Sequence, residues 1–229
     1  MWRDDQRELT AFLLHSRPFQ ENTQLVELLT DEGKIAAVVY VSDSKKSNKK
    51  ALLQPFTPLL VTIRGQNQLK KMSKVESAGK SYILSAEHLY SGFYLNELLV
   101  RLLPENVPCI DLYQTYSDAL ARLNDKQPIE VLLRQFERAL LQELGFSIDF
   151  SVVYQDNAQI YRYVIDEGLV PALSLDKGYS REHLIAIEQG QLTQPEVLQT
   201  YKRLMREVFA PLLGGKPLQS RKLFIKAKT

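Results

Sequence analysis

The chain has 229 residues, 45% of them hydrophobic and 24% charged, and its formal net charge is only +2. This composition fits a globular protein of one or two domains and excludes the disordered class. No run approaches the length of a membrane-spanning helix, and the N-terminal segment lacks the apolar core of a signal peptide. One cysteine supports neither an internal disulfide nor a thiolate metal cage, so we expect a cytoplasmic protein.

Charge is distributed unevenly along the chain. Residues 1–80 hold 13 Lys and Arg against 9 Asp and Glu, whereas residues 81–213 are acidic and the last sixteen residues carry five bases and no acid. Four lysines fall within the six residues from Lys45 to Lys50. Such a cluster is either a solvated linker or a surface that meets a polyanion, and the pattern alone leaves both open.

The first 80 residues have the pattern of strands. Five short segments, mostly rich in aliphatic or β-branched residues, are separated by turn signals. Between the second and third, Asp31-Glu32-Gly33 has hairpin spacing, and the glycine is free to take a positive φ. We expect a small five-stranded barrel of the OB type, with the lysine cluster between strands three and four. The expected strands are 9–17, 23–30, 34–42, 58–64 and 69–77.

After residue 80 the apolar period becomes helical. Ser85 can cap a helix that runs to about Leu103, and Asp111 can cap a second one. The third helix has Pro128 in its first turn and Gly145 as its stop. Each helix presents a broad apolar face, as expected for a packed helical domain.

Two features complete the predicted architecture. A short hairpin at about 161–170 interrupts the helices, and Thr193 with Glu196 has the spacing of a capping box for a further helix. The predicted fold class is α+β: a five-stranded OB-fold barrel, then a mainly helical C-terminal domain with a small β-hairpin insertion. The predicted domains are 1–80 and 81–229, with the hairpin region at about 151–180.

Motifs for catalysis are not found. The three histidines lie far apart, and none has a metal-ligand neighbour one helical turn away. Gly214-Gly215-Lys216 lacks both the first glycine and the Ser or Thr of a phosphate loop, and no nucleophile-elbow motif is present. We therefore predict no catalytic residue, no metal and no cofactor, and rank a nuclease or nucleotide-dependent enzyme last.

Five blocks of sequence, spread in order over nearly the whole chain, match one known family. They are FLLHSRPFQENTQLVELLTDEGK (12–34), ALLQPFTPLL (51–60), LYSGFYLNELLVRLL (89–103), LLRQFERALLQELGFSIDF (132–150) and PLLGGKPLQSRKLF (211–224). Together they resemble RecO, the bacterial mediator of recombination repair, of the gamma-proteobacterial kind.

The resemblance implies an N-terminal OB fold, a C-terminal helical domain and a non-enzymatic function at the nucleoid. It implies binding of single- and double-stranded DNA, annealing of strands, and cooperation with RecR in loading RecA onto gaps coated by single-stranded DNA-binding protein. Many members hold a zinc with four cysteines in the C-terminal domain. Region 151–180 of this chain has no cysteine, so no zinc is expected there.

Within this resemblance the lysine cluster is the predicted DNA contact, because a lysine on a phosphate releases condensed counterions. Tyr40-Val41 and Asp43 stand where relatives often have glycine and further bases, so we expect the contact to be shifted along the loop. Tyr40 is either a stacking surface or part of the core. The predicted DNA-binding residues are Lys45, Lys46, Lys49, Lys50, Tyr40, Arg64, Lys70, Lys71 and Lys74.

The third helix offers a predicted partner site. Arg134 borders its apolar face, which suits a peptide that is both acidic and hydrophobic, such as the C-terminal tail of single-stranded DNA-binding protein. Arg138, one turn on, can assist. The alternative for Arg134 is an ion pair with Glu130 or Glu137. The rival function for the whole chain is an adaptor that contacts only proteins and makes no direct contact with DNA.

Overall fold

The computed structural model describes residues 6–41, 49–65, 68–174 and 178–226. They form two compact units: the chain up to Gln127 together with the segment from Leu218, and Pro128–Pro217. In the sequence, the second unit is thus inserted between two segments of the first. The predicted division into 1–80 and 81–229 stays a prediction.

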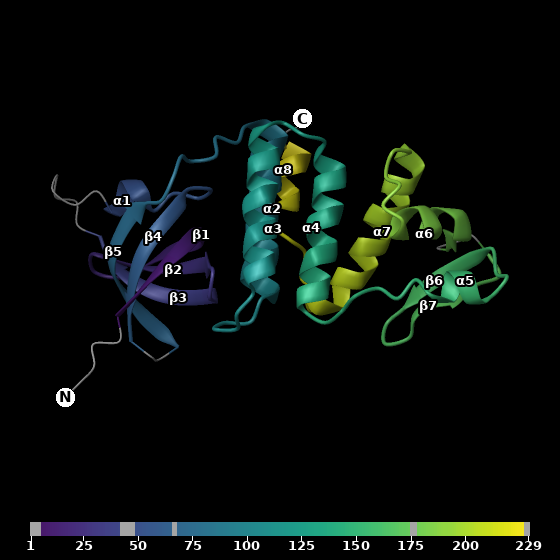
Figure 1. Ribbon diagram of the computed structural model, residues 1–229, viewed down its shortest axis with the longest axis horizontal. Coiled ribbons are helices and arrows are strands. Elements are labelled where there is room, and N and C mark those ends of the chain that lie inside the picture. The colour runs from purple at the N-terminus through teal and green to yellow at the C-terminus, as the bar shows by residue number, and fades with distance from the viewer. Residues whose placement is uncertain (1–5, 42–48, 66–67, 175–177, 227–229) are drawn as a thin grey trace. The chain divides into compact units, whose positions relative to one another are not determined.

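Five strands of the first unit close into a barrel in the order β1-β2-β3-β5-β4, and β1 also pairs with β4 (Figure 1). The β3–β5 pair is parallel, and the other four pairs are antiparallel. With helical segments following the barrel, the predicted fold class is confirmed. The elements are β1 (Gln6–Gln20), β2 (Thr23–Thr30), β3 (Gly33–Tyr40), α1 (Lys49–Leu52), β4 (Pro58–Arg64) and β5 (Leu69–Ser77).

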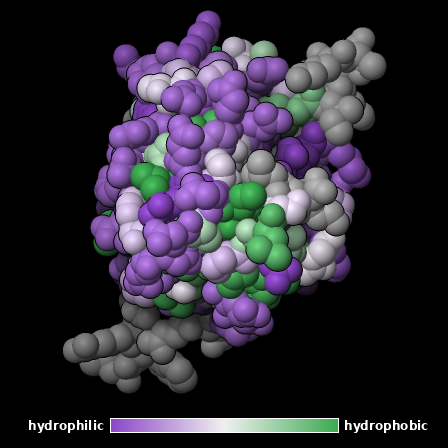
Figure 2. All heavy atoms as spheres, turned by 90° about the vertical axis from the view of Figure 1, so that its right-hand side faces the viewer, coloured by the Kyte–Doolittle hydropathy of each residue, from purple (hydrophilic) through white to green (hydrophobic). Residues whose placement is uncertain are grey.

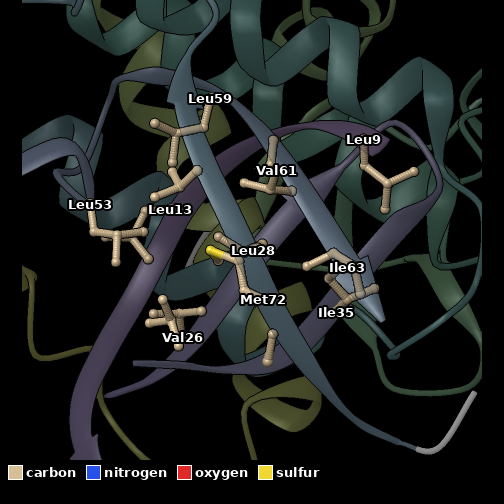
Figure 3. Close-up of a cluster of buried hydrophobic side chains, with 14 residues drawn as sticks. Leu9, Leu13, Val26, Leu28, Ile35, Leu53, Leu59, Val61, Ile63 and Met72 are labelled. Atoms are coloured by element: carbon tan, nitrogen blue, oxygen red, sulfur yellow. The ribbon is translucent and has the colours of Figure 1, made fainter. Parts of the chain in front are cut away.

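The barrel is filled by side chains from alternate positions of its strands, because successive residues point to opposite sides of a sheet. The buried cluster contains aliphatic residues from all five strands and Leu53, which directly follows α1 (Figure 3). Val41 and Leu52 are partly buried against it. The short helix is therefore fixed to the barrel by its apolar side.

The β2–β3 hairpin confirms the predicted role of Gly33. Its φ is +111°, and a Cβ atom there would lie 2.1 Å from the carbonyl oxygen of Val107. Only glycine meets both conditions without displacing the backbone. The Thr30 hydroxyl donates to the Gly33 carbonyl at 2.7 Å and closes the turn.

Besides α1, the described part of the first unit contains three helices that pack with the barrel or with one another. Asn96 donates to the Leu14 carbonyl of β1 at 3.0 Å and accepts from the Tyr116 hydroxyl at 2.6 Å, all in the buried interior. The Tyr116 ring also meets Phe12 edge to face, at 5.2 Å between centroids. Buried polar groups need such partners. The helices are α2 (Ala86–Leu102), α3 (Ile110–Asn124) and α8 (Arg221–Lys226).

The helix α8 is joined to α2 by one carboxylate. Glu97 accepts from the backbone nitrogens of Gln219 and Ser220, each at 2.8 Å, and from the Ser220 hydroxyl at 2.6 Å. The rings of Tyr90 and Phe224 pack 5.7 Å apart. The segment 218–226 is thereby built into the first unit.

In its described residues, the second unit has four helices and a three-stranded sheet in the order β7-β6-β8. Within it, α4 packs against α7, and α6 packs against α7. The side of this unit turned to the viewer in Figure 2 is mostly hydrophilic, with smaller hydrophobic areas. The elements are α4 (Ile129–Glu143), α5 (Val152–Gln155), β6 (Ile160–Val164), β7 (Gly168–Pro171), β8 (Tyr179–Ser180), α6 (Arg181–Glu188) and α7 (Pro195–Leu212).

The predicted hairpin at 161–170 is confirmed as β6 and β7, and the region around it is held by packing and hydrogen bonds. Tyr161 and Tyr179 are fully buried. The Tyr161 hydroxyl donates to Asp156, and the Arg203 guanidinium lies 4.4 Å from the centre of the Tyr179 ring. A neighbouring arginine, Arg181, donates to the Val153 carbonyl at 2.7 Å.

Helix starts were predicted less well than helix bodies. Ser85 occupies the N-cap of α2 without a capping hydrogen bond from its side chain. The prediction for Asp111 was wrong, since α3 begins at Ile110 and its N-cap is Cys109, two residues before the predicted cap. The Thr193–Glu196 capping box was also wrong: α7 begins at Pro195, whose fixed φ and missing N–H suit a first helical position.

Candidate nucleic-acid interface

Strand β5 carries three lysines, and its pairing with β4 decides where each one points. Ser73 is skipped in this pairing, which makes it the extra residue of a β-bulge. On a regular strand, residues three apart face opposite sides. The bulge resets the alternation, so that Met72 and Val75 are both buried while Lys71 and Lys74 are both exposed.

The bulge also receives a lysine from another element. The Lys49 ammonium, at the start of α1, donates to the Ser73 carbonyl at 2.9 Å. The buried Leu53 fixes α1 against the barrel, so this contact has a rigid base. Lys50, the next residue, is exposed. Lysines from α1 and β5 are thus brought to the same side of the barrel.

Arg64 joins this surface at the end of β4. Its Cα pairs with that of Lys71, and the residue is exposed. The guanidinium donates from Nε and Nη2 to Gln6 Oε1 at 3.0 and 2.7 Å. Because the glutamine amide is neutral, it orients the guanidinium without cancelling its charge.

Lys74 differs from its neighbours because a carboxylate is bonded to it. Its ammonium lies 2.9 Å from Glu76, and this hydrogen bond and charge raise the pKa of Lys74. Both side chains are about half exposed. The pair leaves Lys74 on the surface, but a phosphate there must compete with Glu76.

The structure places the third β5 lysine, Lys70, elsewhere than predicted. It is only 4% exposed, and its ammonium donates to Asn106 Oδ1. Burial and then the charge of Arg7 lower the pKa of Lys70. The position precedes the bulge and alternates inward with Met72, so Lys70 does not join the exposed lysines.

Two aromatic residues on either side of the lysine cluster in sequence, Tyr40 and Phe56, differ in exposure. Tyr40, the last residue of β3, is 56% exposed, whereas Phe56 is buried and packs 5.2 Å from Phe93 between ring centroids. Of the four clustered lysines, Lys49 and Lys50 are described. Lys45 and Lys46 lie outside the described residues.

In the second unit, Arg134 is an interior residue of α4. Its guanidinium lies 2.6 Å from Glu137 Oε1, and the two side chains are only 7% and 1% exposed. This is the ion pair that the sequence offered as the alternative, but it is buried. The Arg134 Nε atom has no hydrogen-bond partner.

Arg138, one turn further, is exposed and lines a cavity of about 100 Å³. Its Nη1 atom donates to the Glu188 carbonyl at 3.3 Å. Burial raises the pKa of Tyr201 to about 12, so its hydroxyl remains a donor at neutral pH, although the nearby Arg138 charge lowers that pKa. The cavity is lined by Arg138, Leu141, Gln142, Ser147, Ile148, Phe150, Tyr201 and Met205.

The exposed face of the barrel carries cations from two strands and a helix. Comparison with known proteins gives independent evidence of the family to which the chain belongs. The family model for the recombination protein O N terminal matches residues 5–80, and that for the recombination protein O C terminal matches residues 84–203. The chain belongs to the RecO family. This membership confirms the resemblance and assigns the chain to DNA repair and recombination.

Individual RecO relatives match over almost their whole length. The DNA repair protein RecO of Stutzerimonas stutzeri is 41% identical, over 95% of this chain and 93% of the relative. The DNA repair protein RecO of Pseudomonas paraeruginosa is 38% identical, over 95% and 94%. That of Pseudomonas putida strain GB-1 is 40% identical, over 94% and 96%.

Sequence reasoning missed the residues that organise this RecO surface. Ser73 and Gln6 are uncharged, so the charge pattern of the sequence does not indicate them. Ser73 nevertheless positions Lys49, and Gln6 positions Arg64. One signal was present: Met72 and Val75 are apolar residues three apart on a strand, a spacing that a regular strand cannot bury on one face. Among the described residues, no helix is long and apolar enough to cross a membrane, and no cluster of metal-ligating side chains is found.

Proposed function

We propose that this RecO-family chain is a non-enzymatic mediator that binds single- and double-stranded DNA through its barrel and anneals complementary strands. With RecR it would help load RecA onto gaps coated by single-stranded DNA-binding protein, at the nucleoid in the cytoplasm. The observation that carries DNA binding is the cationic surface assembled by the Ser73 bulge. Its described members are Lys49, Lys50, Arg64, Lys71 and Lys74.

The proposed mechanism of annealing is electrostatic. Two DNA strands repel each other through their phosphates, and cations on one rigid surface lower that repulsion while the bases pair. Lys49 and Arg64 suit this purpose because neutral groups orient them: a backbone carbonyl and a glutamine amide. The backbone carbonyl that Lys49 contacts does not neutralise its ammonium, so that charge is available to a phosphate. Lys45 and Lys46, which lie outside the described residues, are included in the proposed site from the sequence alone.

The alternative function is an adaptor that contacts only proteins. Such an adaptor would have the same fold, but its lysines would not contact DNA. A filter-binding titration with a single-stranded oligonucleotide, repeated over several salt concentrations, separates the two. Each phosphate contact contributes about 0.7 to the slope of log affinity against log salt on single strands. Replacing the four described lysines should flatten the slope by about 1 to 3 units for every DNA sequence alike. The variant is Lys49→Ala, Lys50→Ala, Lys71→Ala and Lys74→Ala.

A matched variant removes four positive charges from other parts of the chain and should keep the parental slope. An unchanged slope in the folded test variant, or an equal loss in both variants, would refute the proposed DNA surface. A parent chain that binds no DNA would favour the adaptor. The control substitutions are Lys80→Ala, Lys126→Ala, Arg162→Ala and Lys202→Ala.

The second unit supports a proposed partner site. The cavity beside α4 combines apolar walls with Arg138 and the neutral hydroxyl of Tyr201, and the exposed Phe146 directly precedes its rim residue Ser147. A peptide ending in a hydrophobic residue with a free carboxylate has the complementary chemistry. We propose that the tail of single-stranded DNA-binding protein binds here, with Arg138 as its ionic contact and the buried Arg134 supporting α4.

A further inference from the structure

Tyr40 stands at the open end of β3 with its ring outside the barrel. Its neighbours in sequence, Val39 and Val41, belong to or pack on the barrel core, so strand alternation turns Tyr40 outward. The Val41 amide donates to the Asn22 carbonyl at 2.8 Å, which keeps this end of the strand in place. A large aromatic side chain is therefore held on a rigid strand with 56% of its surface exposed.

The strands on either side leave the ring uncovered. The Cα partner of Tyr40 on β2 is Thr23. On β5, Val39 pairs with Met72, the last pair of this parallel ladder, so Ser73 is the next position in register toward Tyr40. Both neighbours are small hydroxyl residues that cannot shield an aromatic face. Among the described residues, Tyr40 has no ring stacked against it and no arginine placed over it.

Two lysines of the barrel surface are associated with Ser73 of β5. The Lys49 ammonium is bonded to the Ser73 carbonyl, and Lys71 lies two residues before Ser73 on the exposed side of β5. An uncovered ring next to ammonium groups is the combination that binds one strand of a nucleic acid: the cations contact phosphates, and a base stacks on the ring.

We propose that Tyr40 is a stacking platform for an unpaired base and makes this surface prefer single-stranded over double-stranded DNA. The proposal rests on the proposed function and adds its strand selectivity. In a duplex, each base is covered by its neighbours, so no face is available to Tyr40, whereas the phosphates remain available to the lysines. The ring should therefore affect single strands alone.

Fluorescence anisotropy with a short single-stranded oligonucleotide, its duplex, and a single strand of the same length made entirely of abasic sites tests this. Tyr40→Leu should weaken binding of the ordinary single strand about tenfold, while Tyr40→Phe and Tyr40→Trp retain it. Binding of the duplex and of the abasic strand should stay unchanged. The salt slope of Tyr40→Leu should equal that of the parent, because no phosphate contact is lost.

Phe19, an exposed aromatic residue of β1, supplies the control, and Phe19→Leu should bind all three probes like the parent. Equal affinity of Tyr40→Leu and the parent for the single strand overturns the platform but leaves the lysine surface intact. The stacking platform is also overturned if Tyr40→Leu weakens binding of the abasic strand or of the duplex as strongly as binding of the ordinary single strand. If the parent binds no DNA, the proposed function itself fails.

Discussion

Lys49 on the barrel and Arg134 in the second unit are two cations with opposite surroundings. Lys49 is bonded to a backbone carbonyl and remains at the surface. In the second unit, Arg134 is buried against the carboxylate of Glu137. A cation held by a neutral group keeps its charge for a partner, whereas one neutralised in the interior serves the fold. The partner of a basic residue is therefore more informative than its presence.

The strongest test of this comparison is Arg134→Ala. Removing one member of a buried ion pair leaves the other charge unpaired, which costs about 3–5 kcal/mol of unfolding free energy. Urea unfolding at neutral pH measures it. Replacing both members, Arg134→Met with Glu137→Leu, should restore most of the loss. A small effect of Arg134→Ala would mean that the pair is not structural.

Arg138 should behave as the functional member of the same helix. Arg138→Glu is expected to weaken binding of a hydrophobic peptide with a free C-terminal carboxylate by about 10- to 100-fold, because it replaces an attractive charge by a repulsive one. Titration of a fluorescent peptide measures this. Arg162→Glu on β6, outside the cavity, is the control. If Arg138→Glu binds the peptide as tightly as the parent does, the cavity is not the peptide-binding site.

Glu76 offers a way to strengthen the barrel surface instead of weakening it. Glu76→Gln removes the carboxylate that competes for Lys74, so affinity for single strands should rise about threefold and the salt slope should steepen by up to about 0.7. The pKa of Lys74 would fall back toward its ordinary value and the group would stay charged at neutral pH. No change in affinity would show that Lys74 does not meet DNA.

The smallest expected effect concerns acid stability of the second unit. The Tyr161 hydroxyl and the Ala158 amide donate to Asp156 and lower its pKa below the ordinary 3.8. A lowered folded-state pKa stabilises the fold above that ordinary value, and the gain is lost as the pH falls through the folded-state pKa. Asp156→Asn should therefore unfold at lower urea than the parent at neutral pH, and the difference should shrink in acid. A constant difference would contradict this.

The sequence predicted the strands well and the orientation of their charges poorly. Alternating apolar residues are a local signal, so 58–64 and 69–77 were assigned with the bounds that β4 and β5 have. The bulge at Ser73 lies in the pairing of β5 with β4, and in the sequence only the spacing of Met72 and Val75 indicates it. On a regular strand, Lys71 and Lys74 would face opposite sides.

The same limit applies to the helices. The pattern of α4 placed Arg134 at the border of the apolar face, and the residue is in fact covered. Burial of a border position depends on the neighbouring element, here α7, which begins more than fifty residues later. Arg138 and Tyr201 meet at the cavity for the same reason, and only the folded chain brings them together.

The hydrogen bonds from Gln219 and Ser220 to Glu97 have a consequence for folding during synthesis on the ribosome. The barrel, α2 and α3 emerge first, but the segment that bonds Glu97 is made only after the whole of Pro128–Pro217 has been translated. Domains generally fold as units as they emerge. Until then, the Glu97 carboxylate lacks its partners Gln219 and Ser220, and the Tyr90 ring lacks Phe224 of α8. A nascent chain stalled before Leu218 should therefore be cut near α2 by protease more readily than the finished protein.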